Sequence, residues 1–384
     1  MKKSVYYWSP FISKVGTVKS TLNSACSLAK YSQNYDVRII NVFGEWSEYQ
    51  KKIEENGVKL ENLTFNYSSI LPYKGFFKSR FTYILIILIS IIPLTILLIK
   101  KKPDYFIAHL ITSLPLALFN LLKIKTKLVL RISGHPKLNF FRKKLWTRSS
   151  NKIFKVTSPT NELLKDLVDS KIFQSEKLKL LPDAIINLKE IIDYQKKSNS
   201  DKFFTENNDY FLAVGRFTKQ KNFLFLIKEF KKFCNQKPNE KLFLIGEGEL
   251  KEKIEIEIKK NNLQNNIKII GFTNNIYKYM KKSKAFLLTS LWEEVGFVIV
   301  EAAMCNSLVI SSNCKNGPKE FLSNGDAGLL FENNVENKLY EKLIEFSKLD
   351  NSKIVKKKIL AKKNCNKFTG FRHFKKLTEV IQDI

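Results

Sequence analysis

The chain has 384 residues, of which 44% are hydrophobic, and its 66 Lys and Arg against 36 Asp and Glu give a formal net charge of +30. These values exclude a largely disordered chain and predict a mainly globular protein of two domains. The charge favours polyanionic partners, namely nucleic acid, an anionic membrane leaflet or phosphorylated substrates, and a Lys/Asn/Ile-rich composition also explains part of it.

Short apolar runs alternate with amphipathic segments along the whole chain, which is typical of parallel sheets wrapped by helices. In the first half a helix is predicted at 18–30. The predicted strands are 4–9, 36–43, 104–110, 127–133, 152–158 and 177–183, then 210–216, 241–248, 266–272, 285–290, 308–312 and 328–331. We therefore predict an α/β protein with a Rossmann-like N-terminal domain at 1–186 and a second one at 209–364. The polar stretch 187–208 is the predicted linker.

The segment 81–99 is uncharged over its whole length and is flanked by Lys78 and Arg80 before it and by Lys100 to Lys102 after it. A helix of this length reaches across a bilayer core, so hydropathy alone makes it a transmembrane candidate. However, predicted strands of one sheet lie on both sides of it. We favour a helix or helical hairpin packed partly in the core and partly in the cytoplasmic membrane surface, with a buried core helix and a spanning helix as the alternatives.

Several familiar signals are absent from the sequence. No apolar h-region follows the N-terminal MKKSVYYWSP, so no signal peptide is predicted. Five scattered cysteines without CxxC spacing indicate reduced cytoplasmic thiols, and no metal site is predicted. The chain has no recognition helix, RNP sequence or zinc-finger pattern, so nucleic acid is not a predicted partner.

Two predicted strands end in loops suited to bind anions. Gly16 and Thr17 open the first helix, where backbone N–H groups and the helix dipole attract a substrate or phosphate, although an ordinary strand-to-helix turn explains them equally well. After strand 210–216, Arg216 and Lys221 are placed to clamp a diphosphate. A solvated basic loop is the alternative for this pair.

The stretch SLWEEVGFVIVEAA, residues 290–303, carries the strongest signal. It leaves a strand, passes Glu293 and enters a helix at Gly296, so that the N–H groups of Phe297 and Val298 are free for phosphate or sugar oxygens. Glu293 and Glu301 are good acceptors for paired hydroxyl groups such as those of ribose or a hexose. The alternative is that one acid caps the helix and Glu301 is exposed on the surface.

Together these motifs resemble the family 4 retaining glycosyltransferases. The matching elements are KVGT, VGRFTKQKN, LIGEGEL, GFTNNIYKYMKKSKAFLLTSLWEEVGFVIVEA, SSNCKNGPKE and the C-terminal tail. The resemblance implies the GT-B architecture, two facing Rossmann-like domains with a cleft between them, and a C-terminal helix within 365–384 that crosses back to the first domain. It implies that Arg216 and Lys221 neutralise the donor diphosphate, that Glu293 approaches the donor sugar and that Glu301 holds the ribose.

The sequence departs from the family pattern at two places. Glu294 and Val295 stand where the family has glycine and phenylalanine after the first acid. Ser133 stands where the family often has a histidine that contacts the transferred sugar. His135 lies two residues later and His109 ends the preceding strand, so all three are predicted as possible substrate contacts.

The resemblance implies a metal-independent enzyme without a cofactor that transfers a hexose-type sugar from a nucleotide-diphosphate sugar. The acceptor would be a saccharide or a polyprenyl-diphosphate-linked saccharide in bacterial capsule, O-antigen or exopolysaccharide synthesis. The enzyme would be cytoplasmic and peripheral on the inner face of the membrane. A nucleotide-sugar epimerase or phosphorylase of the same architecture and a non-catalytic polyanion-binding protein are the alternatives.

Overall fold

The computed structural model describes residues 2–12, 16–65, 76–136, 138–196, 210–273 and 275–382, with the backbone alone at 76–80. The chain divides into two compact units. Unit 1 comprises Met1–Ile185 and Thr369–Ile384, and unit 2 comprises Ile186–Phe368, so the chain passes between the units twice. The two units are described separately below.

Unit 1 contains a seven-stranded parallel sheet in the order β3-β2-β1-β4-β5-β6-β7. Its strands are β1 (Lys3–Trp8), β2 (Tyr35–Asn41), β3 (Lys59–Asn62), β4 (Tyr105–Ala108), β5 (Lys127–Arg131), β6 (Ile153–Ser158) and β7 (Leu178–Leu180). The apolar runs predicted each of them except β3. That edge strand reads KLEN and has no fully buried residue, so it lacks the apolar pattern on which the prediction depended.

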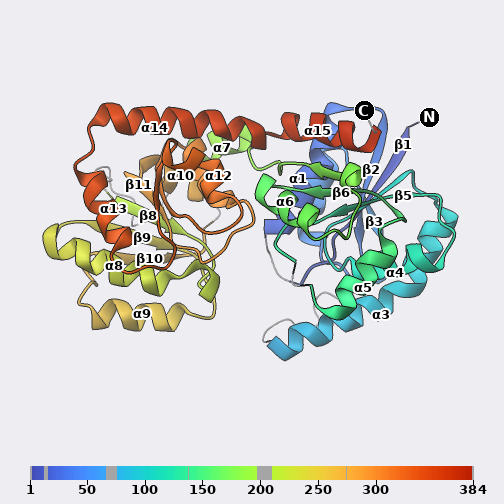
Figure 1. The fold of residues 1–384 in the computed structure, drawn as a ribbon, viewed down its shortest axis with the longest axis horizontal. Coiled ribbons are helices and arrows are strands. Elements are labelled where there is room, and N and C mark those ends of the chain that lie inside the picture. The colour runs from blue at the N-terminus through green and yellow to red at the C-terminus, as the bar shows by residue number, and fades with distance from the viewer. Residues whose placement is uncertain are drawn as a thin grey trace. The chain divides into compact units, whose positions relative to one another are not determined.

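Helices cover both faces of this sheet (Figure 1). They are α1 (Gly16–Tyr31), α2 (Gln50–Glu55), α3 (Phe76–Lys100), α4 (Ser113–Leu121), α5 (Phe140–Ser149), α6 (Asn161–Asp169) and α15 (Gly370–Gln382), with short 3₁₀ turns η1 (Ser47–Tyr49) and η2 (Ser175–Lys177). Strand β1 shows the division, because successive side chains point to opposite faces. Val5 and Tyr7 pack in a core with residues of α1 and α15, whereas Tyr6 and Trp8 pack in a core with residues of α3 and α4.

Unit 2 contains a six-stranded parallel sheet in the order β10-β9-β8-β11-β12-β13. Its strands are β8 (Tyr210–Val214), β9 (Lys241–Ile245), β10 (Ile267–Gly271), β11 (Ala285–Leu288), β12 (Leu308–Ser312) and β13 (Leu329–Phe331). Its helices are α7 (Leu188–Lys196), α8 (Phe223–Gln236), α9 (Lys251–Lys260), α10 (Ile276–Lys282), α11 (Phe297–Met304), α12 (Pro318–Phe321), α13 (Lys338–Ser347) and α14 (Asn351–Asn364), with η3 (Lys219–Lys221), η4 (Ser323–Gly325) and η5 (Cys365–Phe368). The doubly wound arrangement repeats that of unit 1.

The predicted linker 187–208 differs from the structure in its first part. Residues Leu188–Lys196 form α7, which buries Ile191 and contacts α10 within unit 2. The polar composition hid this helix, because a single apolar face on a short helix leaves most of its residues charged or polar. The remaining part, 197–208, lies outside the described residues.

Helix α3 runs without interruption from Phe76 to Lys100 and contains Pro93, so the hairpin form of the prediction is wrong. It is long and apolar enough to cross a membrane by length and composition, and one third of its most apolar window is buried. It connects β3 to β4, and these strands belong to the same sheet because β1 pairs with both β2 and β4. A helix that spans a bilayer once would deliver its ends to opposite sides, which this strand pairing does not allow.

Candidate functional site

In each unit most of the predicted site residues follow the strands at which the order of the sheet reverses; Ser133 and His135 follow β5 instead. In unit 2 the chain proceeds from β8 outward to β9 and β10, then returns to the other side of β8 with β11. Arg216 and Lys221 follow β8, and Glu293 follows β11. Ligands of open α/β sheets bind at this switch point, outside the carboxyl ends of the strands. The connectivity of the sheet therefore brings residues that are more than 70 positions apart into one place.

Lys221 and Glu293 are in direct contact. The distance between Lys221 Nζ and Glu293 Oε1 is 2.5 Å, and the two side chains are only 14% and 7% exposed. Removing two charged groups from water is costly, and the cost is offset only when further hydrogen bonds satisfy those groups. Here the hydroxyl of the fully buried Ser290 donates to the same carboxylate oxygen at 2.5 Å. The hydroxyl of Ser312 in turn donates to the carbonyl of Ser290 at 2.7 Å.

Arg216 leaves the end of β8 beside this pair. Its side chain is exposed and has no hydrogen-bond or ion-pair partner among the described residues. Gly215, the preceding residue, lies against the aliphatic stem of Lys221, since a Cβ on Gly215 would be 3.2 Å from three of its carbons. Both cations therefore emerge at the same strand end, one paired and one available to an anion.

Two glycines of the LIGEGEL segment allow the loop after β9 to press against the loop that carries Arg216. A Cβ on Gly246 would lie 1.9 Å from the carbonyl oxygen of Gly215, and a Cβ on Gly248 would lie 2.5 Å from that of Phe217. Backbone hydrogen bonds of 3.0 Å from Gly215 and 2.8 Å from Phe217 join the two loops. These contacts fix the backbone from which Arg216 projects.

Helix α11 begins at Phe297, directly after Gly296, whose φ is 78° and whose conformation is left-handed. Such a backbone costs a side-chain-bearing residue free energy that glycine avoids. Phe297 and Val298 are half-buried in the first turn, where amide groups have no partner within the helix. The loop before α11 packs on Gly317, where a Cβ would lie 2.5 Å from the carbonyl oxygen of Val295.

Glu301 is 3% exposed in α11 and accepts a hydrogen bond from the Tyr277 hydroxyl at 3.4 Å. Glu293 is likewise buried. The alternative of an exposed Glu301 is therefore wrong. A buried carboxylate must be hydrogen-bonded to offset its loss of water, whereas an exposed carboxylate is solvated.

In unit 1 the switch point lies between β1 and β4. Gly16 and Thr17 open α1 after β1, and residues 13–15 before them lie outside the described residues. His109 follows β4, is buried, and its Nδ1 has no hydrogen-bond partner in the described part of the chain. Burial, together with the nearby charge of Arg131, holds the pKa of His109 well below its usual value, so that the imidazole is neutral.

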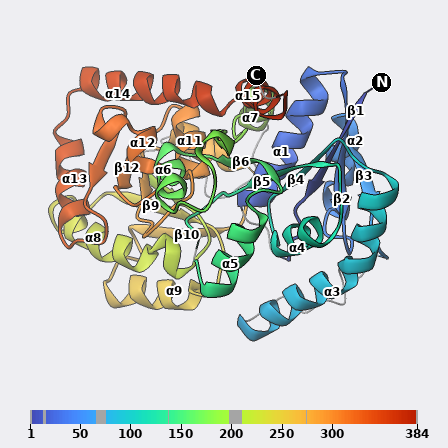
Figure 2. The same cartoon turned by 45° about the vertical axis from the view of Figure 1, so that its right-hand side comes forward.

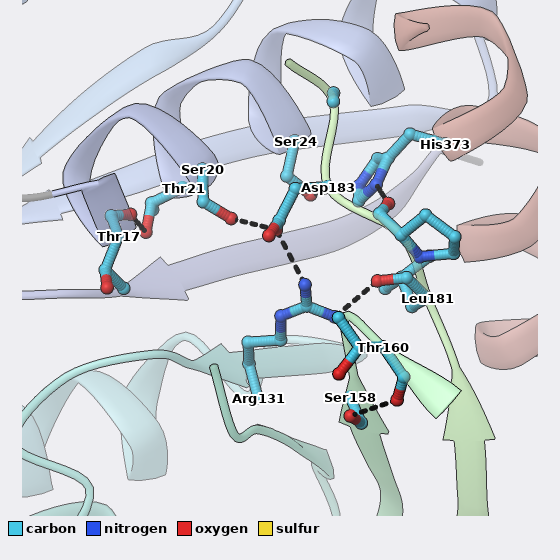
Figure 3. A network of polar contacts seen from close by, with 12 residues as sticks. Thr17, Ser20, Thr21, Ser24, Arg131, Ser158, Thr160, Leu181, Asp183 and His373 are labelled. Carbon is cyan, nitrogen blue, oxygen red and sulfur yellow. Dashed lines mark hydrogen bonds and ion pairs between the residues drawn. The ribbon is translucent and has the colours of Figure 1, made fainter. Parts of the chain in front are cut away.

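A buried polar network of unit 1, which includes Arg131, Asp183 and His373, was not predicted from the sequence (Figure 3). Arg131, at the end of β5, forms an ion pair with Asp183 at 2.6 Å, and both side chains are less than 5% exposed. Ser20 of α1 donates to the same carboxylate oxygen. Arg131 also donates to the carbonyl of Leu181 at 2.6 Å. The network thus ties α1 and β5 to the segment that leads into unit 2.

The direction of the hydrogen bonds around His373, in α15, follows from its partners. Its Nδ1 lies 2.6 Å from the carbonyl of Pro182, which only accepts, so Nδ1 carries the proton. Nε2 then accepts from the Ser24 hydroxyl at 2.7 Å, and Ser24 accepts from the Tyr7 hydroxyl at 3.0 Å. One sequence pattern could have predicted this network, namely the Ser and Thr residues that recur along one face of α1. They are all buried: Thr17, Ser20, Thr21, Ser24 and Ser27.

The other two predicted substrate contacts, His135 and Ser133, form no side-chain hydrogen bond with the network of Arg131 and His373 within the described ranges. His135 is exposed, and its Nδ1 pairs with Asp166 of α6 at 2.9 Å. The hydroxyl of Ser133 is buried and has no partner among the residues described. Within those residues no group of three or more His, Cys, Asp or Glu is arranged to hold a metal ion.

Residues 195–362 match the model of the family glycosyl transferases group 1. An uncharacterized glycosyltransferase of Methanocaldococcus jannaschii is 32% identical over 237 residues, which are 58% of each chain. The 4-alpha-N-acetylgalactosaminyltransferase of Campylobacter jejuni that acts on N-acetylgalactosamine-N,N'-diacetylbacillosaminyl-diphospho-undecaprenol is 30% identical over 231 residues, 57% of this chain and 60% of that protein. The match thus spans less than two thirds of either relative.

Among solved structures, Anabaena HepE in complex with UDP and glucose superposes with a TM-score of 0.72 at 14% identity, and all of both chains is covered. Two doubly wound parallel units, each with polar residues at its switch point, define a protein of the GT-B fold. Residues 195–362 of this chain are similar to the glycosyl transferases group 1 family, and the relatives that it matches are glycosyltransferases.

Proposed function

We propose that this protein transfers a hexose-type sugar from a nucleotide-diphosphate sugar to a saccharide or a polyprenyl-diphosphate-linked saccharide, with retention of anomeric configuration. The pathway would be the synthesis of a surface polysaccharide, and the protein would act at the inner face of the cytoplasmic membrane. Two similarities support this proposal: the Campylobacter relative acts on a diphospho-undecaprenol substrate, and the Anabaena neighbour binds UDP and glucose.

The observation that carries the proposal is the pairing of Lys221 with Glu293 beside Arg216, which has no partner among the described residues, at the switch point of unit 2. A donor diphosphate brings two negative charges to this place. Arg216 binds it through its planar fork, and Lys221 has three N–H donors and keeps its contact with Glu293 while donating to phosphate oxygen. The amides of Phe297 and Val298 add neutral donors at the start of α11.

The two acids recognise the rest of the donor. Glu293 accepts a hydrogen bond from a hydroxyl of the transferred sugar, and Glu301 accepts hydrogen bonds from the ribose hydroxyls.

In the transfer step the bond between the anomeric carbon and the diphosphate oxygen breaks, and the acceptor hydroxyl oxygen attacks from the same face. Its proton passes to the leaving diphosphate, whose charge Arg216 and Lys221 stabilise. These cations do the work for which other enzymes use a metal ion. In unit 1, Gly16, Thr17 and the neutral His109 contact substrate at the end of β1 and β4.

Two measurements test this function. A thermal-shift screen against nucleotide sugars identifies the donor, because a ligand that binds only the folded protein raises Tm. With that donor, transfer to a lipid-linked saccharide is measured for Arg216→Ala, Lys221→Ala and the control Lys219→Ala, an exposed lysine in the same loop. We expect a loss of about 100-fold or more in kcat/KM for the first two and little change for the control.

Two results would reject the proposal. Unchanged turnover in both Arg216→Ala and Lys221→Ala would remove the diphosphate site. Interconversion of nucleotide sugars when the acceptor is omitted would instead indicate an epimerase.

A further inference from the structure

Helix α3 has two apolar faces, and only one of them is used inside unit 1. Ile86, Ser90, Leu94 and Leu97 recur at helical spacing and are buried, the apolar members within the core beneath the sheet. The opposite side, here called the outer face, consists of Ile84, Leu88, Ile91, Ile92, Ile96 and Ile99, which are 39% to 70% exposed. Isolated exposed apolar residues are common, but a continuous stripe along a whole helix indicates an interaction surface.

The neighbouring helices extend this surface. Helix α4 contacts both α3 and α5, and Figures 1 and 2 show the three helices gathered along one edge of unit 1. Leu121, at the end of α4, is 76% exposed. Phe140 and Phe141 open α5 at 74% and 80% exposure, with ring centroids 5.7 Å apart. Two adjacent exposed phenylalanines at the start of α5 add a second apolar projection to this group of helices.

Exposed basic residues follow these apolar side chains directly in the sequence. Lys100, Lys101 and Lys102 follow the end of the outer face, and Arg142, Lys143 and Lys144 follow the two phenylalanines, all of them exposed. Apolar side chains with adjacent lysine and arginine residues match the boundary of an anionic bilayer, where acyl chains lie beside negatively charged head groups. A second copy of this chain would bring like charges together at the same surface, in a protein with a net charge of +30.

We propose that the outer face of α3, together with Phe140 and Phe141, is a docking surface for an anionic lipid bilayer, on which α3 lies parallel to the membrane plane. The strand pairing on both sides of α3 keeps the helix on one side of the bilayer. This docking surface rests on the proposed function, in which the acceptor is anchored in the membrane. Binding of α3, α4 and α5 to the bilayer would place unit 1 close to that acceptor.

Sedimentation of the full chain with vesicles tests this surface. We expect the protein to bind vesicles of equal parts phosphatidylcholine and phosphatidylglycerol about tenfold or more tightly than vesicles of phosphatidylcholine alone, and added salt to weaken the binding. Leu88→Glu/Ile92→Glu should lower binding to the anionic vesicles by about tenfold or more, because each substitution places a charge in the acyl region. The matched control is Ile256→Glu, an exposed isoleucine of α9 in unit 2, which should bind as the wild type does.

A second variant keeps the test valid if the α3 variant folds poorly. Phe140→Ser/Phe141→Ser leaves α3 intact and should lower vesicle binding while Tm is unchanged. Transfer to a water-soluble saccharide should be unchanged in both variants, whereas failure of the proposed function would appear as no transfer in the wild type. Thus the two proposals fail in different assays.

Three outcomes would overturn the docking surface. One is that the wild type binds neither kind of vesicle. A second is that Leu88→Glu/Ile92→Glu abolishes a concentration-dependent dimer seen without vesicles, which would make the outer face an interface between copies. The third is that alkaline carbonate fails to release the bound protein from the vesicles, which would indicate a helix inserted across the bilayer.

Discussion

Lys221 and Glu293 form an ion pair of 2.5 Å although they lie on the exit loops of two different strands, β8 and β11. The pair means that the site holds a lysine already positioned and partly desolvated before an anion arrives. Arg216, in contrast, has no hydrogen-bond or ion-pair partner among the described residues. The site is therefore preorganised on one side and open on the other, which suits a ligand with both phosphate and hydroxyl groups.

The ion pair predicts a separation of stability from activity. Lys221→Met leaves a buried carboxylate without its cation and should lower the free energy of unfolding by about 3 kcal/mol. The double variant Lys221→Met/Glu293→Gln removes both charges and should recover most of this loss, while sugar transfer remains about 100-fold or more below wild type. Urea denaturation and initial rates measure the two effects. Recovery of activity along with stability would show that the pair is only structural.

Ser290 is predicted to position Glu293. Its hydroxyl donates to the carboxylate from a fully buried site, so Ser290→Ala should release Glu293 and reduce kcat/KM by about tenfold, the value of a hydrogen bond to a charged group. Ser283→Ala is the control, because Ser283 is also buried and bonds to Ser307 at 2.7 Å in the same unit. The control should lower stability without lowering kcat/KM. An equal loss of activity in both variants would argue against a specific role for Ser290.

Gly317 is predicted to hold the loop before α11 in place. In Gly317→Ala the new methyl group would meet the carbonyl of Val295 at 2.5 Å, so the loop that carries Glu293 must move. Gly325 also has a positive φ, 110° against 123° at Gly317, but nothing lies within 4 Å of its Cβ position. Gly325→Ala should therefore show backbone strain alone, about 1 kcal/mol, whereas Gly317→Ala should also weaken donor binding. Calorimetric titration with the identified donor measures the difference.

The stability of unit 1 should depend on pH through His373. Burial lowers the pKa of His373 from 6.5 to about 4, and the hydrogen bond to the Pro182 carbonyl opposes this shift without reversing it. Between these values the unfolded chain binds a proton that the folded chain does not. Stability is therefore complete above pH 6.5 and falls as the pH drops toward 4, by about 3 kcal/mol for this group.

The measurement for this prediction is urea unfolding at about pH 5 and about pH 7.5 for the wild type and for His373→Gln. The variant should be less stable at the higher pH, because it loses a buried hydrogen bond, and should show a smaller loss on acidification. His109 contributes in the same direction, since its pKa is also lowered by burial, so part of the pH dependence should remain. Identical pH dependence in both proteins would contradict the assignment.

The fold was largely predictable because its cores are made of short apolar runs whose burial is a local property of the sequence. LVISS and YFLAV are buried at every position of β12 and β8, and their hydrophobic character alone predicts strands inside a parallel sheet. The same reasoning missed β3, because KLEN lies at the edge of the sheet, and missed α7 in a polar stretch. Edges and short surface helices depend on their neighbours rather than on their own composition.

For the site, the sequence by itself determined the residue types and the strand ends where they stand, from which Arg216, Lys221, Glu293 and Glu301 were all selected. Only the tertiary structure decided which of them touch: Lys221 bonds to Glu293, and Arg216 does not. It also assembled the network of Arg131, Asp183 and His373 from three distant segments, and it separated the two faces of α3. The physical reason is that a hydrogen bond or a buried charge depends on distance in space, which the sheet order sets and sequence spacing does not.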